Sequence, residues 1–363
     1  MSKEIVVNYE EKPCYKIVLE HDFRTLAAKV NELGVQKQQK VCIIADTNTA
    51  ALYLEEVTME LEKCFDTVVS YVFPAGETHK NVDTINEIYQ KLIEEKFDRK
   101  DMLAALGGGV TGDMCGFAAA TYLRGIDFIQ IPTSLLSQVD SSIGGKTGVD
   151  FRQYKNMVGA FYQPKLVYMN LHTLHDLPQE HFYAGLGEIL KHGLIKDAEY
   201  FHWMEKNHEA IMNKEADVLE EMIYRSCRIK QDVVEHDPKE KGERALLNFG
   251  HTIGHAVEKL SDFQLIHGFC VAVGVAAASE LSCRRGKITP SDRDYILRTL
   301  QAFHLPVKAK ITSTQEVLET TKLDKKMESG KVKFILLKEI GSAFIDKTVS
   351  DEEMLQVIEF IAE

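Results

Sequence analysis

Four short apolar segments recur at regular intervals in the first part of the chain, and this recurrence constrains the fold most. They are KVCIIA at 40–45, VVSYVF at 68–73, MLAALGGG at 102–109 and DFIQIP at 127–132. Each ends in a polar or glycine-rich turn, and amphipathic stretches such as 81–97 separate them. Strands that alternate with helices are typical of a doubly wound, mainly parallel sheet. We therefore expect a Rossmann-like α/β domain whose strands, including 40–45 with its DTNTA turn, each end in a loop at the ligand-binding edge.

The second half of the chain has a different periodicity. Long helical patterns cover 215–236 and 271–285, and an apolar β-rich run returns only at KFILL near residue 334. Pro178 follows the last α/β segment, and a chain of 363 residues exceeds the usual size of a single core. The sequence predicts an α/β domain over 1–177, a mainly α-helical domain over 178–363, and an active site in the cleft between them.

The net charge and the cysteine content limit the kinds of partner and the cellular compartment that we expect for this protein. The net charge of -12 disfavours nucleic acid and anionic membranes, and the acidic N-terminal segment MSKEIVVNYEEKP does not resemble a signal peptide. No apolar segment is long enough to cross a bilayer, and the seven cysteines form no C-x-x-C pair. We expect a cytoplasmic protein with reduced thiols, a small-molecule ligand, and no nucleic-acid or membrane partner.

The strand at 102–107 runs into three glycines, and Thr111-Gly112-Asp113 then opens a helix rich in small residues. Glycines allow a backbone to approach a pyrophosphate, and a helix N-terminus favours an anion. The G-x-G-x-x-G dinucleotide fingerprint is met only loosely, because the acidic residue expected downstream is missing. Asp46 and Asn48 are candidates for the ribose contact. The alternative is a glycine-rich turn that only packs its helix tightly.

Five residues in the helical domain are candidate metal ligands. Glu188 and His192 lie four residues apart, as do His251 and His255, and His267 follows at the head of an apolar helix. Residues four apart share one helix face. Three histidine or carboxylate ligands with an open position are typical of catalytic zinc. Spacing alone leaves the choice among the five open, and ordinary buried histidines are the alternative.

Lysines and arginines recur beside glycines and turns, although the protein is acidic. They are Arg124, Lys146, Lys155, Lys191 and Arg244. Arginine grips carboxylate or phosphate with two hydrogen bonds, and lysine acts as a point charge. A small substrate that carries both groups suits this set, although any one of these residues taken singly is more often a solvated surface charge.

Several long motifs occur in a diagnostic order: GGGVTGD, QIPTSLLSQVDSSIGGKTGVD, KNMVGAFYQP, AGLGEILKHGLI, ALLNFGHTIGHAVE and LIHG. With them the chain, from Asp46 to the DKK at 324–326, resembles the 3-dehydroquinate synthase family of sugar-phosphate cyclases. The resemblance implies a lyase of the shikimate pathway, usually a homodimer, that uses NAD and a divalent metal, Zn²⁺ or Co²⁺. Its reaction converts 3-deoxy-D-arabino-heptulosonate 7-phosphate to 3-dehydroquinate and phosphate by transient oxidation, elimination, re-reduction and aldol cyclisation.

The resemblance also implies roles for individual residues, with NAD on the α/β domain and metal and substrate on the helical one. The implied metal ligands are Glu188, His251 and His267, whereas His192 stands where the family often has tyrosine. The implied NAD contacts are Asp46, Asn48, Glu77, Lys80, Gly108, Gly109, Asp113, Thr133, Ser134 and Leu136. The implied catalytic residues are His255, Lys146, Lys191, Arg244 and Asn248, and the other substrate contacts are Asp140, Lys155, Asn156, Lys230, Lys326 and, from a neighbouring subunit, Arg124.

Two positions depart from the family pattern. Phe269-Cys270 follows His267-Gly268 where the family has a glutamate, and Ser134 replaces the commoner threonine. Neither change removes a metal ligand or a charged substrate contact, so both concern fine positioning. The alternatives are an aminocyclitol-type cyclase or an iron-type polyol dehydrogenase of the same fold, and a metal-binding structural or regulatory protein without turnover.

Overall fold

The computed structural model describes residues 3–152, 154–261, 265–322, 327–328 and 331–363. Contacts divide the chain into two compact units, Met1–Leu177 and Pro178–Glu363. Among the described residues, no helix is long and apolar enough to span a membrane.

The first unit is built on a seven-stranded sheet with the order β1-β2-β9-β6-β5-β3-β4. The strands are β1 (Lys3–Tyr9), β2 (Lys12–Glu20), β3 (Lys40–Asp46), β4 (Thr67–Phe73), β5 (Met102–Gly107), β6 (Asp127–Pro132) and β9 (Leu166–Asn170). Only β1 pairs antiparallel with its neighbour, and every other pairing is parallel. The predicted doubly wound, mainly parallel sheet is therefore confirmed, although the sequence did not reveal β1, β2 and β9.

Helices cover both faces of this sheet. The helices of the unit are α1 (Leu26–Asn31), α2 (Thr47–Leu61), α3 (Val82–Glu94), α4 (Gly109–Thr121) and α5 (Thr173–Asp176), with short turns η1 (Glu77–His79), η2 (Tyr122–Arg124) and η3 (Ser137–Ser141). One apolar core joins α1 and α2 to Val41, Ile43 and Ala45 of β3. A second core joins α3 and α4 to Cys42 and Ile44 of the same strand. Alternate side chains of β3 thus enter opposite cores, which explains its continuous apolar run.

The expectation of a loop after residues 40–45 was wrong. Helix α2 begins at Thr47, directly after β3, so the DTNTA segment forms its first turn. The Asp46 carboxylate accepts hydrogen bonds from the backbone N–H groups of Asn48 and Thr49 at 2.9 and 3.1 Å. Because an aspartate N-cap satisfies the first free N–H groups of a helix, no connecting loop is required.

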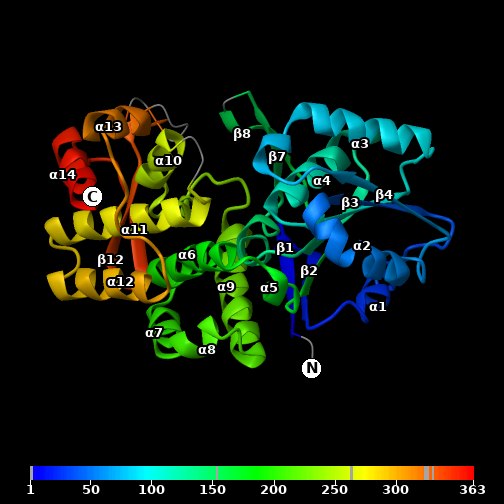
Figure 1. Cartoon of the computed structure of the whole chain (residues 1–363), viewed down its shortest axis with the longest axis horizontal. Coiled ribbons are helices and arrows are strands. Elements are labelled where there is room, and N and C mark those ends of the chain that lie inside the picture. The colour runs from blue at the N-terminus through cyan, green and yellow to red at the C-terminus, as the bar shows by residue number, and fades with distance from the viewer. Residues whose placement is uncertain (1–2, 153, 262–264, 323–326, 329–330) are drawn as a thin grey trace. The chain divides into compact units, whose positions relative to one another are not determined.

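The second unit is mainly helical, as predicted. Its helices are α6 (Gln179–Lys196), α7 (Ala198–Lys206), α8 (His208–Met212), α9 (Ala216–His236), α10 (His251–Leu260), α11 (His267–Arg284), α12 (Pro290–Ala302), α13 (Thr314–Lys322) and α14 (Asp351–Ile361), with the turn η4 (Glu243–Asn248). Its strands form two hairpins, β10 (Met327–Glu328) with β11 (Lys331–Val332) and β12 (Phe334–Glu339) with β13 (Ser342–Asp346). Helix α11 contacts α6, α10, α12, α14 and β12, so it forms the centre of the unit (Figure 1).

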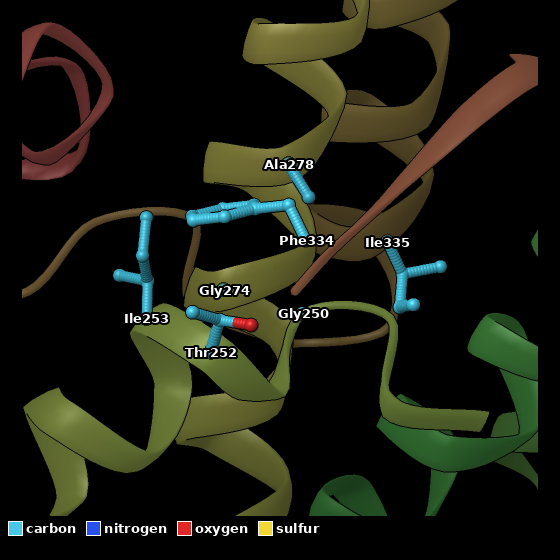
Figure 2. A pocket seen from close by; sticks show the side chains of 7 residues that line it. All are labelled: Gly250, Thr252, Ile253, Gly274, Ala278, Phe334 and Ile335. Atoms are coloured by element: carbon cyan, nitrogen blue, oxygen red, sulfur yellow. The ribbon is translucent and has the colours of Figure 1, made fainter. Parts of the chain in front are cut away.

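Figure 2 shows a small pocket beside this central helix. Its lining comes from α10 and the turn before it, from α11 and from β12: Gly250, Thr252, Ile253, Gly274, Ala278, Phe334 and Ile335. The pocket is too narrow to hold a water molecule and its exposed lining is mainly apolar. It is a packing gap of the core, and it is not a ligand site.

Candidate active site

Three helices of the second unit bring a carboxylate and two imidazoles together. Glu188 lies in α6, His251 is the first residue of α10, and His267 is the first residue of α11. The Oε1 atom of Glu188 lies 3.6 Å from Nε2 of His251 and 3.7 Å from Nε2 of His267. Residues that are up to 79 positions apart in sequence thus point three donor atoms at one spot.

Glycines allow the helices that carry these residues to cross with their backbones in contact. A Cβ atom on Gly268 would lie well inside 3.0 Å of the Ala184 carbonyl oxygen, and one on Gly274 would overlap the carbonyl oxygen of Gly250 in the same way. A Cβ on Gly187 would lie 2.8 Å from the carbonyl oxygen of Gly268. Real Cβ atoms do not approach that closely, so only glycine permits these crossings. Because two of these glycines adjoin donor residues, the crossings set the distances within the cluster.

The Nδ1 atom of each imidazole faces a group that can only accept a hydrogen bond. Nδ1 of His251 lies 3.3 Å from the carbonyl oxygen of Phe249, and Nδ1 of His267 lies 3.1 Å from Oε2 of Glu258. Chemistry therefore assigns the proton to Nδ1 in both rings. In the neutral imidazole this leaves a lone pair on each Nε2, directed at Glu188.

The carboxylate of Glu188 supplies the test of whether a metal fits. The side chain is 1% exposed, and its Oε2 atom accepts a hydrogen bond from Nζ of Lys191. Its Oε1 atom is buried and has no hydrogen-bond donor among the described residues. The two Nε2 atoms are too distant for good hydrogen bonds and carry lone pairs of their own. A buried acceptor that faces two further acceptors is costly without a cation, and two nitrogens with one oxygen are a ligand set that Zn²⁺ accepts.

The remaining two candidates from the sequence lie close by in different surroundings. The ring of His255 lies 5.0 Å from that of His251 and 5.7 Å from that of His267, and nitrogens of the three histidines come within 4.8 Å of one another. His192 is fully buried, and its Nδ1 atom lies 2.7 Å from Oγ of Ser226. His255 thus remains a group that can reach the same spot, and His192, whose Nδ1 atom meets α9, still offers a ligand atom within 4.8 Å of one on Glu188.

Basic side chains predicted to contact substrate are buried in the same unit. Lys191, Lys230 and Arg244 are 1%, 5% and 2% exposed. Arg244 is held by its backbone N–H to Asp237, at 3.1 Å, and by its guanidinium to the Pro238 carbonyl, at 2.8 Å. Buried cations are stabilised by anions, and Lys191 already meets the carboxylate of Glu188. Three buried cations in one unit together suit an anionic ligand.

Two other residues of the second unit, Asn248 and Lys326, were also predicted to contact the substrate. The side-chain amide of Asn248 donates to Oε1 of Glu240 at 2.8 Å, at the end of η4, the turn that also carries Arg244. Lys326 and the rest of the DKK segment lie outside the described residues.

In the first unit the glycine turn leads from β5 into α4, as the sequence predicted. Gly108 caps the helix with its backbone, and the Thr133 N–H donates to the Gly107 carbonyl at 3.0 Å. A Cβ on Gly108 would lie 3.5 Å from Oγ of Ser134, and one on Gly109 would lie 3.1 Å from Oγ of Ser141. The turn after β6 therefore lies against the glycine turn, at the start of a helix whose N–H groups favour an anion.

This turn lies at the point where the chain reverses its direction across the sheet. Strand β3 continues to β4 on one side, whereas β5 pairs with the other side of β3 and continues to β6. Ligands of doubly wound sheets bind at such a point. Asp46 ends β3 here, and Oγ1 of Thr111 in α4 donates to it at 3.4 Å. Asp46 is thus already the cap of α2, and Asn48 lies exposed in the first turn of that helix.

A buried lysine connects predicted cofactor and substrate residues. Lys80, which is 5% exposed, donates from Nζ to Oδ2 of Asp113 and to Oδ1 of Asn156, both at 2.7 Å. The Asn156 N–H donates to Asp150 at 2.7 Å, and the Asp150 N–H donates to the Lys80 carbonyl at 2.8 Å. These bonds fasten the hairpin β7 (Lys146–Phe151) and β8 (Tyr154–Phe161) to α4 and η1. No pattern in the sequence predicted this hairpin.

Charges in this network shift each other's protonation. Burial acts to lower the pKa of Lys80, but the carboxylates of Asp113 and Glu77 outweigh it and raise that pKa. Burial raises the pKa of Asp113 more than Lys80 lowers it. Glu77 also lies 3.8 Å from Nζ of Lys155, so the second predicted substrate lysine of the hairpin faces the same acidic group.

Four further predicted residues of this unit occupy different places. Arg124 is exposed at the end of η2 with a left-handed φ of 71°, and Lys146 is exposed at the start of β7. Asp140 lies within η3, and Leu136 caps that turn.

Sequence reasoning missed the partners that orient the predicted residues. Glu258 is one signal that was readable, because it follows His251 by seven residues and His255 by three and so shares their helix face. The Phe249 carbonyl, Ser226 and Asp150 carry no comparable pattern, since their roles depend on how distant segments meet.

Comparison with solved structures defines the class of protein. The fold matches that of ValA, a 2-epi-5-epi-valiolone synthase from Streptomyces hygroscopicus subsp. jinggangensis 5008 solved with NAD⁺ and Zn²⁺, with a TM-score of 0.88, 26% identity and coverage of 98% of both chains. It also matches 2-deoxy-scyllo-inosose synthase, solved with carbaglucose-6-phosphate, NAD⁺ and Co²⁺, with a TM-score of 0.87, 23% identity and coverage of 99% of both chains. The architecture is that of the dehydroquinate synthase-like cyclases.

Sequence comparison then gives the family. The 3-dehydroquinate synthase N-terminal model matches residues 70–184, and the C-terminal model matches residues 185–327. The 3-dehydroquinate synthase of Acetivibrio thermocellus is 41% identical over 350 residues, which cover 96% of this chain and 96% of that protein. The chain belongs to the 3-dehydroquinate synthase family.

Proposed function

We propose that this protein is a 3-dehydroquinate synthase, a carbon–oxygen lyase that converts 3-deoxy-D-arabino-heptulosonate 7-phosphate to 3-dehydroquinate and phosphate. Family membership supports this reaction. The observation that carries it is the buried Oε1 atom of Glu188, which faces Nε2 of His251 and of His267 without a proton donor among the described residues. A polar cluster that needs a cation, within a cyclase fold, supports turnover more than a structural role.

Glu188, His251 and His267 would hold one divalent cation, Zn²⁺ or Co²⁺, and the turn at Gly108 and Gly109 would hold NAD. When bound, the metal supplies Lewis acidity to a substrate oxygen, and NAD supplies a reversible hydride acceptor. The two solved cyclases, which contain NAD⁺ with Zn²⁺ or Co²⁺, support both cofactors. The remaining predicted NAD contacts are proposed with them.

The chain's own residues would bind the anionic ends of the substrate and move protons. Buried Lys191, Lys230 and Arg244 would neutralise the carboxylate and the departing phosphate, because each offers a cation held away from water. His255 lies one helical turn from His251, where it would act as general acid and base. Asn248, which Glu240 orients, would donate to a substrate oxygen.

The remaining substrate contacts are proposed from the first unit and from a second copy. Lys155 and Asn156 lie together on the hairpin that Lys80 fastens, and Lys146 and Asp140 lie at or before its start. We further propose a cytoplasmic homodimer in which the exposed Arg124 reaches the phosphate of a neighbouring subunit. Arg124 has a left-handed φ at the end of η2, the turn that follows α4.

The decisive experiment measures phosphate release from the heptulosonate phosphate with and without NAD and Zn²⁺. We expect release only when both are present, with 3-dehydroquinate as product and no accumulation of NADH. Accumulated NADH would identify a dehydrogenase, and a different carbocyclic product would identify another cyclase. No release from metal-loaded protein with NAD would refute the proposal.

A further inference from the structure

A carboxylate that the proposed mechanism does not use lies beside the metal cluster. Glu258 lies in the third turn of α10 and is 4% exposed. Its Oε2 atom lies 3.1 Å from Nδ1 of His267, at the start of α11. It is therefore a buried acidic group directed at an imidazole whose other nitrogen faces Glu188.

We propose that Glu258 is a positioning residue, which holds His267 in the tautomer and the ring orientation that bind the metal. The inference rests on the proposed function only in that a divalent cation binds at Glu188, His251 and His267. Glu258 itself would touch neither the metal nor the substrate, and it would act through His267.

The need for such a residue follows from how unequally the two imidazoles are held. The side chain of His251 is 11% exposed and that of His267 is 32% exposed, so packing alone restrains the second ring less. His251 has a backbone carbonyl as its Nδ1 partner, and His267 has the Glu258 carboxylate. A carboxylate that accepts from Nδ1–H keeps the Nε2 lone pair available and raises the basicity of the ligand.

The same contact is independent of the positions at which the chain departs from the family pattern. Phe269 and Cys270 stand where the family has a glutamate after the third ligand, which raised a question about the positioning of His267. The acidic partner of His267 comes from α10, across the helix crossing, and this contact does not depend on those two positions. Glu258 thus joins α10 and α11 at the cluster itself.

The test measures the affinity of the purified protein for Zn²⁺ by competition with a chromophoric chelator, together with the absorption spectrum of the Co²⁺-loaded protein. The variants are Glu258→Ala, which removes the acceptor, and Glu258→Gln, which keeps an acceptor of the same size without charge. The matched control is Glu280→Gln, because Glu280 is a similarly buried carboxylate of α11 that pairs with Arg284 and Arg293 instead.

We expect Glu258→Ala to weaken Zn²⁺ binding by about 10–100-fold, the usual effect of losing an outer partner, with Glu258→Gln intermediate and the Co²⁺ bands altered in both. Glu280→Gln should keep the wild-type affinity and spectrum even if its thermal stability falls. Wild-type affinity in folded Glu258→Ala, or an equal loss of affinity in Glu280→Gln, would overturn the proposal. If Glu258→Ala does not fold, an unchanged affinity and spectrum in Glu258→Gln would overturn it. Should the unmodified protein bind no Zn²⁺, the proposed function itself fails first.

Discussion

The two units assemble their polar residues in opposite ways. In the first unit the side chains come from the ends of neighbouring parallel strands and the turns that follow them, so the sheet places them together. In the second unit they come from the starts and middles of helices that cross with backbones in contact. At the strand ends, each turn places its own side chains, so a substitution in one turn should leave the others in place. At the helix crossings, the distances between donor atoms depend on every crossing, so one substitution should disturb them all. The contrast predicts where substitutions act.

The largest effect is expected from removing a proposed ligand, which tests whether the helix-crossing cluster is a metal site. His251→Ala should weaken Zn²⁺ binding by more than the roughly 100-fold expected of an outer partner, and activity should be lost with the metal. His255→Ala, one turn away, should keep the metal and lose about 10²–10⁴-fold in kcat. Metal content and kcat of both variants provide the measurement. Loss of metal in His255→Ala together with retention in His251→Ala would mean that the ligand choice is wrong.

The next prediction tests whether backbone contacts between helices set the distances between Glu188, His251 and His267. Gly268→Ala should destabilise the fold by at least about 1–3 kcal/mol, because its Cβ would overlap the Ala184 carbonyl and push α6 from α11. Zn²⁺ affinity should fall with it, since Glu188 and His267 lie on those two helices. The matched control is Gly286→Ala, just beyond the other end of α11, where φ is +65° and nothing lies within 4 Å. That control should cost only about 1 kcal/mol of backbone strain and leave Zn²⁺ affinity unchanged.

A smaller and more local effect is expected in the first unit. Lys80→Met should destabilise the hairpin's attachment by about 1.5–3 kcal/mol for each lost charged hydrogen bond and should weaken NAD binding, without changing Zn²⁺ affinity. A double-mutant cycle with Asn156→Ala, measured by urea unfolding, should give a coupling of about 0.5–3 kcal/mol. Lys165→Met, which breaks an exposed 3.3 Å ion pair with Asp127, is the control with about 0–1 kcal/mol. A drop in Zn²⁺ affinity in Lys80→Met would break the contrast between the units.

The smallest effect concerns an ion pair away from both sites. The Arg285 guanidinium and, to a smaller extent, the hydrogen bonds of Ser350 lower the pKa of Glu353 to about 2, against its ordinary 4.5. These contacts stabilise the fold fully above pH 4.5, and their contribution is lost as the pH falls towards 2. Arg285→Met should therefore cost about 1 kcal/mol at pH 7, because the pair is partly exposed, and less at pH 3. Urea unfolding at both pH values measures the difference. Equal costs at the two values would contradict this account, and NAD and Zn²⁺ affinities should not change at either.

Residues of the first unit could be located from sequence because local pattern and sheet topology act together. The apolar runs predicted β3, β4, β5 and β6, and parallel pairing then places the turns after them at one edge. The hairpin β7–β8 was missed, because β8 is mostly exposed and shows no alternation of apolar and polar residues, and the hairpin is fastened by contacts with Lys80. The loop expected after residues 40–45 was wrong, because Asp46 caps α2 directly.

In the second unit the sequence predicted candidate metal ligands but did not select among them. Helical spacing placed Glu188 with His192, and His251 with His255, on shared faces, and it gave all of them equal standing. Tertiary structure adds distances that spacing lacks, because Nε2 of His251 and of His267 face Glu188 while Nδ1 of His192 meets Ser226. The choice of His251 and His267 as ligands stays a prediction. Such distances depend on where helices cross, and the crossings depend on glycines whose backbone contacts lie far apart in sequence.

The sequence by itself determined the α/β and helical units, the glycine turn into α4 and, through its long motifs, the family. Only the tertiary structure decided that Nε2 of His251 and of His267 face Glu188, that Lys80 connects α4 to the hairpin, and that Glu258 lies against Nδ1 of His267. The physical reason is the distance along the chain over which each interaction acts. Hydrophobic periodicity and capping act over a few residues and are written in the local sequence, whereas the convergence of donors is a property of packed backbones that no local pattern records.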